Sequence, residues 1–233
     1  MISENQPPSS YSDEPVRVRV WDLFVRGVHW LLVLLMVFSW ISAKNGWLGW
    51  HKVSGYAILC LIVFRIYWGF CGSSTARFSH FLRGPKAAGR YLRTLFARDG
   101  RHAFLGHNPL GGWNVIALLS LLALQTGSGL FAVDIDGLES GPLAKYVSFE
   151  TGRRLAGLHG SVFNILLLLI ALHIAAVLGH LVYQRENLVA PMLTGIKRVP
   201  RAHVQIIAFA SPRRALVGLA AIILSIVVLA VWL

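Results

Sequence analysis

The sequence has 233 residues, of which 55% are hydrophobic and only 14% are charged, and its formal net charge is +12. A soluble domain carries roughly a quarter charged residues, so this composition argues against a soluble all-helical protein. The basic residues flank long apolar runs and do not gather in one basic domain, which excludes a nucleic-acid-binding protein. The two cysteines, Cys60 and Cys71, lie on or just beyond one apolar run, so a disulfide framework is not expected.

Residues 1–20 are polar and rich in proline, and we expect them to form a flexible tail without a cleavable signal peptide. Five apolar segments follow, and each approaches the ~20 residues that cross a bilayer. The third opens at Asn108-Pro109, where Asn can cap a helix and Pro suits its first turn. The expected segments are residues 22–43, 50–70, 108–133, 157–183 and 215–233.

These segments predict an all-α integral membrane fold. The first four would form a four-helix transmembrane bundle over residues 21–200, and residues 201–233 would supply a linker and a fifth, C-terminal transmembrane helix. The fifth segment has no His and no ionisable side chain after Arg214, so its expected role is anchoring or partner contact rather than chemistry.

Lysine and arginine alternate between the two sides of the expected bundle. Three of them precede or open the first segment, seven lie between the second and third segments, and six lie between the fourth and fifth. The other two connections carry only Lys44, Lys52, Lys145, Arg153 and Arg154. The positive-inside rule therefore predicts a multi-pass protein of the bacterial inner membrane, with a cytoplasmic N-terminus and a periplasmic C-terminus.

Five of the nine histidines fall inside or at the ends of the apolar segments. Ionisable residues at membrane depth are costly and usually face a functional interior, so a purely structural role for all five is a poor account. The other four lie in or beside the basic connections and are expected to be solvated. The five histidines at membrane depth are His29, His51, His159, His173 and His180.

The spacing of these histidines predicts two sites at different depths. His159 and His173 are 14 residues apart, nearly four helical turns, so they share one helix face about 21 Å apart along the axis. His51 opens the second segment on the outer side and can meet His159. His29 lies about two turns into the first segment from the inner side and can meet His173. His180 shares the same face and is the alternative partner of His29.

Two imidazoles at each of two depths favour haem b. Zinc needs three or four ligands around one ion, and a proton relay would need more Asp and Glu than the segments contain. Neutral imidazoles bind haem iron from both faces, and the porphyrin is apolar. We prefer His173 to His180 as the inner ligand, because it brings the two irons closer and leaves His180 near the surface.

Small and basic residues near these histidines are compatible with a bound haem. Gly55, Gly127, Gly129 and Gly160 let a backbone approach a flat ring, although glycines also serve plain helix packing. The anionic propionates of haem need cationic partners. Each nearby basic residue could equally well serve only to set the orientation of the protein in the membrane. The candidate cations are Lys52, Arg153 and Arg154 on the outer side and Arg26 and Arg65 on the inner side.

Several short stretches together resemble the bacterial cytochrome b561 family, which is related to the b-type cytochrome subunits of nickel-iron hydrogenases. The resemblance covers roughly residues 20 to 200, and its most specific feature is the four histidines in order with the 14-residue spacing. The stretches are Val28-His29-Trp30, Trp50-His51-Lys52-Val53-Ser54-Gly55, Gly106-His107-Asn108-Pro109-Leu110-Gly111, Leu158-His159-Gly160, Leu172-His173-Ile174-Ala175-Ala176, Asn187-Leu188-Val189-Ala190-Pro191-Met192 and Thr194-Gly195.

The resemblance implies a four-helix bundle with two bis-His haems b, the outer held by His51 and His159 and the inner by His29 and His173. It also implies electron exchange with membrane quinone and with a hydrogenase, dehydrogenase or c-type cytochrome. The fifth segment departs from the family pattern and favours an electron-transfer subunit over a stand-alone superoxide or quinone oxidoreductase. A non-redox transporter or scaffold is the lesser alternative. Whether the chain is itself an enzyme stays open, as do the identity of its partner and the direction of electron flow.

Overall fold

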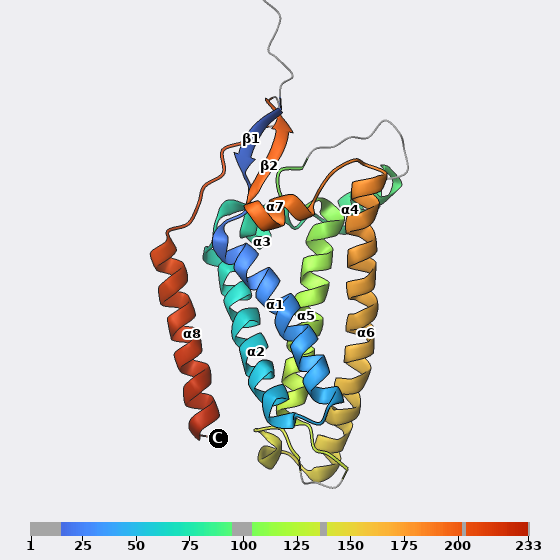
Figure 1. Cartoon of the computed structure of the whole chain (residues 1–233), viewed down its shortest axis with the longest axis vertical. Coiled ribbons are helices and arrows are strands. Elements are labelled where there is room, and N and C mark those ends of the chain that lie inside the picture. Colours follow the sequence, from blue (N-terminus) through green and yellow to red (C-terminus); the bar gives the residue numbers. More distant parts are fainter. Residues whose placement is uncertain (1–14, 95–103, 136–138, 202–203, 233) are drawn as a thin grey trace, which may run out of the picture.

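The computed structural model describes residues 15–94, 104–135, 139–201 and 204–232. Within these residues, four helices are long and apolar enough to cross a membrane: α1 (Leu23–Lys44), α2 (Leu48–Cys71), α5 (Pro109–Phe131) and α6 (Phe149–Val182). They stand side by side as a bundle (Figure 1). The first four predicted segments are therefore confirmed as helices, and the fold is that of a helical membrane protein.

The bundle consists of two closely packed helix pairs. α1 packs along α2 and α5 packs along α6, while α2 and α5 join the two pairs. A buried apolar layer lies at this junction, and side chains of α1 pack against it. Its buried members are Ile58 and Ile62 from α2, Leu122 from α5 and Leu166 from α6.

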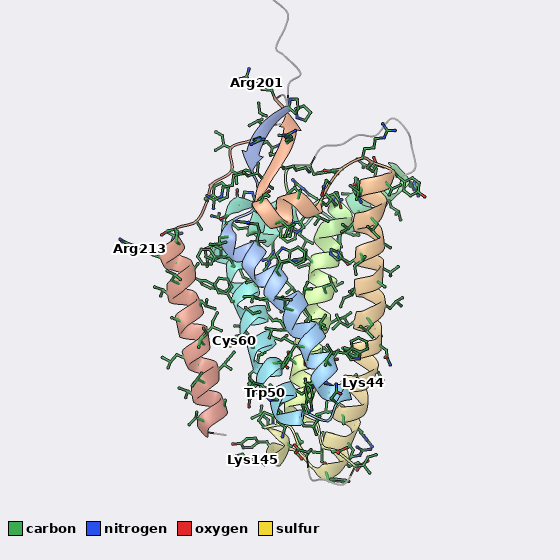
Figure 2. The ribbon with its side chains drawn as sticks, in the orientation of Figure 1. Lys44, Trp50, Cys60, Lys145, Arg201 and Arg213 are labelled. Atoms are coloured by element: carbon green, nitrogen blue, oxygen red, sulfur yellow. The ribbon has the colours of Figure 1, made fainter. Side chains whose placement is uncertain are left out.

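The outward faces of the bundle are apolar. Large side chains such as Leu34 and Leu168 keep 66% and 62% of their surface exposed, although both lie in the middle of long helices. An apolar surface of this extent marks a membrane contact. Figure 2 shows Trp50 and Lys145 toward one end of the bundle and Arg213 toward the other.

One end of the bundle, here called the strand end, carries the short elements. They are β1 (Pro15–Arg19), α3 (Phe78–Phe81), α4 (Pro85–Thr94), α7 (Val189–Thr194) and β2 (Ile196–Pro200), together with the turn η1 (Ser74–Ala76). At the opposite end, the described part of the connection from α5 to α6 contains the turn η2 (Ala144–Tyr146). Figure 1 shows β1 and β2 projecting beyond the helix ends.

The prediction of a flexible tail over residues 1–20 is wrong for the last part of this segment. Pro15–Arg19 is a strand that pairs antiparallel with β2, with Val16 opposite Val199. Val16 and Val18 alternate with exposed residues, as in a strand with one covered face. Residues 1–14 lie outside the described residues.

Gly195 makes the junction between α7 and β2 possible. Its φ is +82°, a left-handed conformation that ends helices and that favours glycine. A Cβ at this position would lie 2.9 Å from the carbonyl oxygen of Trp21. The Gly195 carbonyl accepts a hydrogen bond from the Val20 backbone N–H at 2.8 Å, which ties the entry of α1 to the end of α7.

The fifth predicted segment is helical as well. α8 (Pro212–Trp232) runs beside α2 (Figure 1), and the Tyr67 hydroxyl donates to the Arg214 carbonyl at 3.2 Å. Gly218 lies directly against the Tyr67 ring, so only glycine permits this approach. Leu233, the last residue of the expected segment, lies outside the described residues.

Asp22 fixes the start of α1 and its contact with α2. Its carboxylate accepts from the Val25 backbone N–H at 2.8 Å and from Trp68 Nε1 at 3.0 Å, and its residue is 5% exposed. Asp22→Ala removes a helix cap and leaves a buried indole N–H unpaired, so we expect a loss of about 2 kcal/mol of stability. Thermal unfolding in detergent, followed by tryptophan fluorescence, measures this loss. Asp134→Ala, which removes an exposed loop carboxylate, is the control; equal melting temperatures for both variants would contradict this role.

Candidate functional site

At the end opposite the strands, His51 from the first turn of α2 faces His159 from α6. Their ring centroids are 6.1 Å apart. His51 Nδ1 donates to the Ser39 carbonyl of α1 at 2.9 Å, and His159 Nδ1 donates to the Gln125 carbonyl of α5 at 2.9 Å. We call these two residues the opposite-end pair. Each ring is thus oriented by the helix that packs beside its own.

At the strand end, His29 from α1 faces His173 from α6, with 6.5 Å between the ring centroids. His173 Nδ1 lies 3.0 Å from the side-chain amide of Asn114 on α5. His29 Nδ1 is buried and has no hydrogen-bond partner among the described residues. His29 and His173 are called the strand-end pair below.

Leu166 separates the levels of the two pairs. It lies seven residues from both His159 and His173 on α6, which is about two turns in each direction. Its side chain is fully buried and belongs to the apolar layer between the helix pairs. The two sites are therefore divided by a packed hydrocarbon layer.

His180 is engaged elsewhere. Its Nε2 lies 3.2 Å from the Tyr91 hydroxyl and 3.3 Å from the Asn108 side-chain amide, and its Nδ1 donates to the Ala176 carbonyl at 2.9 Å. The structure thus places His173, and not His180, against His29.

Four of the candidate cations, which lie near the starts of α1, α2 and α6, each have a protein partner. Lys52 pairs with Glu139 at 2.7 Å, and Arg154 pairs with Glu150 at 2.6 Å on the exposed first turn of α6. Arg153 donates to the Val133 carbonyl at 3.3 Å. Arg26 donates to the Leu193 carbonyl of α7. Any anionic group at these positions would share the cations with these partners.

Four polar residues beside the histidines were not among the sequence candidates: Ser39, Asn114, Gln125 and Ser128. Asn114 and Gln125 are amides within an apolar helix, and they are 11 residues apart, about three turns, so they share one face of α5. This spacing on α5 matches the two levels of His173 and His159 on α6. Intramembrane polar side chains on one helix face are the signal that could have identified them.

The number and spacing of the imidazole nitrogens indicate which kind of metal-containing group would fit each histidine pair. Two imidazole nitrogens that bind one metal ion from opposite sides place their ring centroids about 6 Å apart, because each bond is about 2 Å long. The observed separations of 6.1 and 6.5 Å agree with this value. Each site offers two imidazoles, and the described residues hold no cluster of three or more His, Cys, Asp or Glu side chains suited to a metal ion. The group must therefore bring its own equatorial ligands, as haem does.

The residues around His51 and His159 are compatible with a bound haem. A Cβ added at Gly55, one turn after His51, would meet no atom within 4 Å. A Cβ at Gly129 would lie 2.9 Å from the His159 ring, so glycine lets that ring lie against α5. The Gln125 amide nitrogen lies 3.0 Å from His159 Nε2, and ligation through Nε2 would replace this contact.

A membrane helix bundle with facing pairs of intramembrane histidines defines a class of protein, the membrane cytochromes with b-type haem. The family model described as prokaryotic cytochrome b561 matches residues 20–195. The chain belongs to the prokaryotic cytochrome b561 family, and so it is a membrane electron-transfer protein that binds b-type haem. No significant match was found among curated proteins or solved structures.

His107, just before α5, is one of the four histidines expected to be solvated, and this expectation is wrong because its side chain is buried. It lies between the rings of Trp21 and Phe81, at centroid distances of 4.7 and 4.5 Å. Burial, together with the charges of Arg65 and His173, lowers its pKa to about 3. Its side chain therefore stays neutral at physiological pH.

This burial predicts a loss of stability in mild acid. Unfolded His107 would bind a proton near its ordinary pKa of 6.5, whereas folded His107 binds one only near 3. The unfolded state thus takes up more protons between these values, and stability falls as the pH drops below about 6.5. We expect the melting temperature to fall less between pH 7.5 and 5 in His107→Leu than in the wild type. Equal falls in both proteins would show that His107 does not couple folding to pH.

Proposed function

We propose that the chain is a di-haem b-type cytochrome that passes electrons between a periplasmic redox partner and membrane quinone. The observation that carries this proposal is the pair of facing histidines at each of two levels, 14 residues apart on α6. His51 and His159 would hold one haem, and His29 and His173 would hold the other. When bound, the haems supply one-electron chemistry in a region that water does not reach.

The protein's own residues position the ligands. The carbonyls of Ser39 and Gln125 accept the Nδ1 protons of His51 and His159, so Nε2 is the nitrogen left free of a proton. The buried layer around Leu166 keeps the two sites apart and dry. Lys52, Arg153 and Arg154 at the opposite end and Arg26 at the strand end remain our proposed cations for the propionates.

We propose that the strand end is cytoplasmic and the opposite end periplasmic, in a bacterial inner membrane. The strand end carries many more cations than the opposite end, as the positive-inside rule requires of a cytoplasmic side. Under this assignment α8 crosses the membrane as a fifth span. It lies outside the family match and leaves apolar side chains such as Leu224 and Val231 exposed, which suits contact with lipid or with a partner subunit such as a hydrogenase, dehydrogenase or c-type cytochrome.

Haem content tests the di-haem proposal. A pyridine haemochrome assay on the purified protein should give two haems b per chain. His51→Ala and His159→Ala should each leave one haem, with identical remaining spectra. His29→Ala and His173→Ala should leave the other, while His180→Ala should keep both. One haem per wild-type chain would exclude the proposal, and loss of a haem in His180→Ala with retention in His173→Ala would exclude the strand-end pairing.

A reporter fusion tests the topology. Alkaline phosphatase, which is active only outside the cytoplasm, should be active when it is fused after Leu233 and inactive when it is fused after Ser211, ahead of α8. Because the two fusions differ only in whether α8 is included, the comparison tests whether α8 crosses the membrane independently of the four-helix bundle. Equal activity of the two fusions would show that α8 does not cross the membrane.

A further inference from the structure

The two histidine pairs differ in the groups that accept their Nδ1 protons. At the opposite end, both rings are held by backbone carbonyl oxygens, those of Ser39 and Gln125, and both distances are 2.9 Å. A carbonyl oxygen only accepts, so each Nδ1 must carry the proton. Both imidazoles of this pair are therefore hydrogen-bond donors to the backbone.

The two carbonyls sit in the same local arrangement on different helices. On α1, the Ser42 hydroxyl donates to the Ser39 carbonyl at 2.9 Å; on α5, the Ser128 hydroxyl donates to the Gln125 carbonyl at 3.0 Å. In each case a serine three residues further along shares the carbonyl with a histidine of the neighbouring helix. Ser42 and Ser128 are buried, so these acceptors are fixed within the packed helix pairs.

The strand-end pair has a weaker set of acceptors. Among the described residues, the hydrogen-bond contact of His173 Nδ1 is with the side-chain amide nitrogen of Asn114, at 3.0 Å. The amide's oxygen and nitrogen exchange places by rotation, and the oxygen must face Nδ1 if Nε2 is to bind iron. His29 Nδ1 is buried without a partner among the described residues. One neutral amide thus stands where the opposite end has two backbone carbonyls.

A hydrogen bond from Nδ1 makes an imidazole a stronger electron donor to its metal. Stronger donation stabilises the oxidised iron and lowers its reduction potential, and such bonds are one of the protein's main means of setting that potential. The opposite-end site should therefore have the lower potential and the strand-end site the higher one.

We propose, on the basis of the di-haem function, that this difference in acceptors sets a downhill direction from the opposite end to the strand end. With haem held by His51 and His159 at the opposite end and by His29 and His173 at the strand end, the transfer would be of one electron from the first site to the second, with no proton or other group moving with it. Asn114 is the positioning residue of the strand-end site, because its side chain on α5 makes a hydrogen-bond contact with the His173 ring. In the proposed orientation, electrons flow inward across the membrane.

The order of the two potentials is tested by spectroelectrochemical titration of the full-length, haem-loaded protein. The wild type should give two midpoints. His51→Ala should retain the higher midpoint, and His29→Ala should retain the lower one. If His51→Ala keeps the lower midpoint, the proposed direction is wrong although the di-haem function stands. If the wild-type protein binds fewer than two haems per chain, it is the di-haem function that fails.

The role of Asn114 is tested by two variants. Asn114→Leu removes the acceptor and should raise the midpoint of the strand-end site, and Asn114→Asp supplies a stronger acceptor and should lower it. The lower midpoint should not move in either variant, and the electron paramagnetic resonance signal of the strand-end ferric haem should shift. If Asn114→Leu loses that haem, Asn114→Asp still provides the measurement. Asn164→Leu removes an exposed amide from α6 and should leave both midpoints unchanged. Unchanged midpoints in Asn114→Asp, or equal shifts at both sites, would overturn the role of Asn114.

Discussion

The structure depends on the cost of placing an imidazole N–H in hydrocarbon, where water cannot satisfy it. Two of the four facing histidines meet this requirement by donating to a carbonyl of the helix that packs beside their own. His51 on α2 bonds to α1, and His159 and His173 on α6 both contact α5. The closely packed pairs are α1 with α2 and α5 with α6. The same contacts that satisfy the rings therefore decide which helices pair, and the facing rings then span the gap between the pairs.

The apolar layer acts with this constraint to produce two separate sites. His159, Leu166 and His173 repeat every seven residues on α6, so polar, apolar and polar side chains face the interior in turn. Asn114 and Gln125 repeat the two polar levels on α5 with Leu122 between them. The layer therefore places close apolar packing between two polar levels that lie 14 residues apart on α6.

The sequence predicted what periodicity and spacing determine locally. The four spans and the Asn108 cap, which accepts from Gly111 N–H at 2.7 Å, follow from patterns within single helices. The juxtaposition of His29 with His173 was predicted from their matching depths on two different helices. β1 was missed because its partner β2 lies about 180 residues away and a five-residue polar-apolar alternation gives little signal. The pairing of Lys52 with Glu139 depends likewise on a loop conformation that no local pattern encodes.

At the strand end, the neighbours of His29 on α1 are hydrogen-bonded to α7. α7 crosses this end and presents the carbonyls of Met192 and Leu193 toward α1. Trp30 Nε1 donates to the first at 3.2 Å, and Arg26 donates to the second. These side chains flank His29 in the sequence, so the same segment of α1 that carries the histidine uses the α7 carbonyls to dock the strand end. This segment of α1 thus contacts α7 through Trp30 and Arg26, whereas His29 Nδ1 is buried without a hydrogen-bond partner among the described residues.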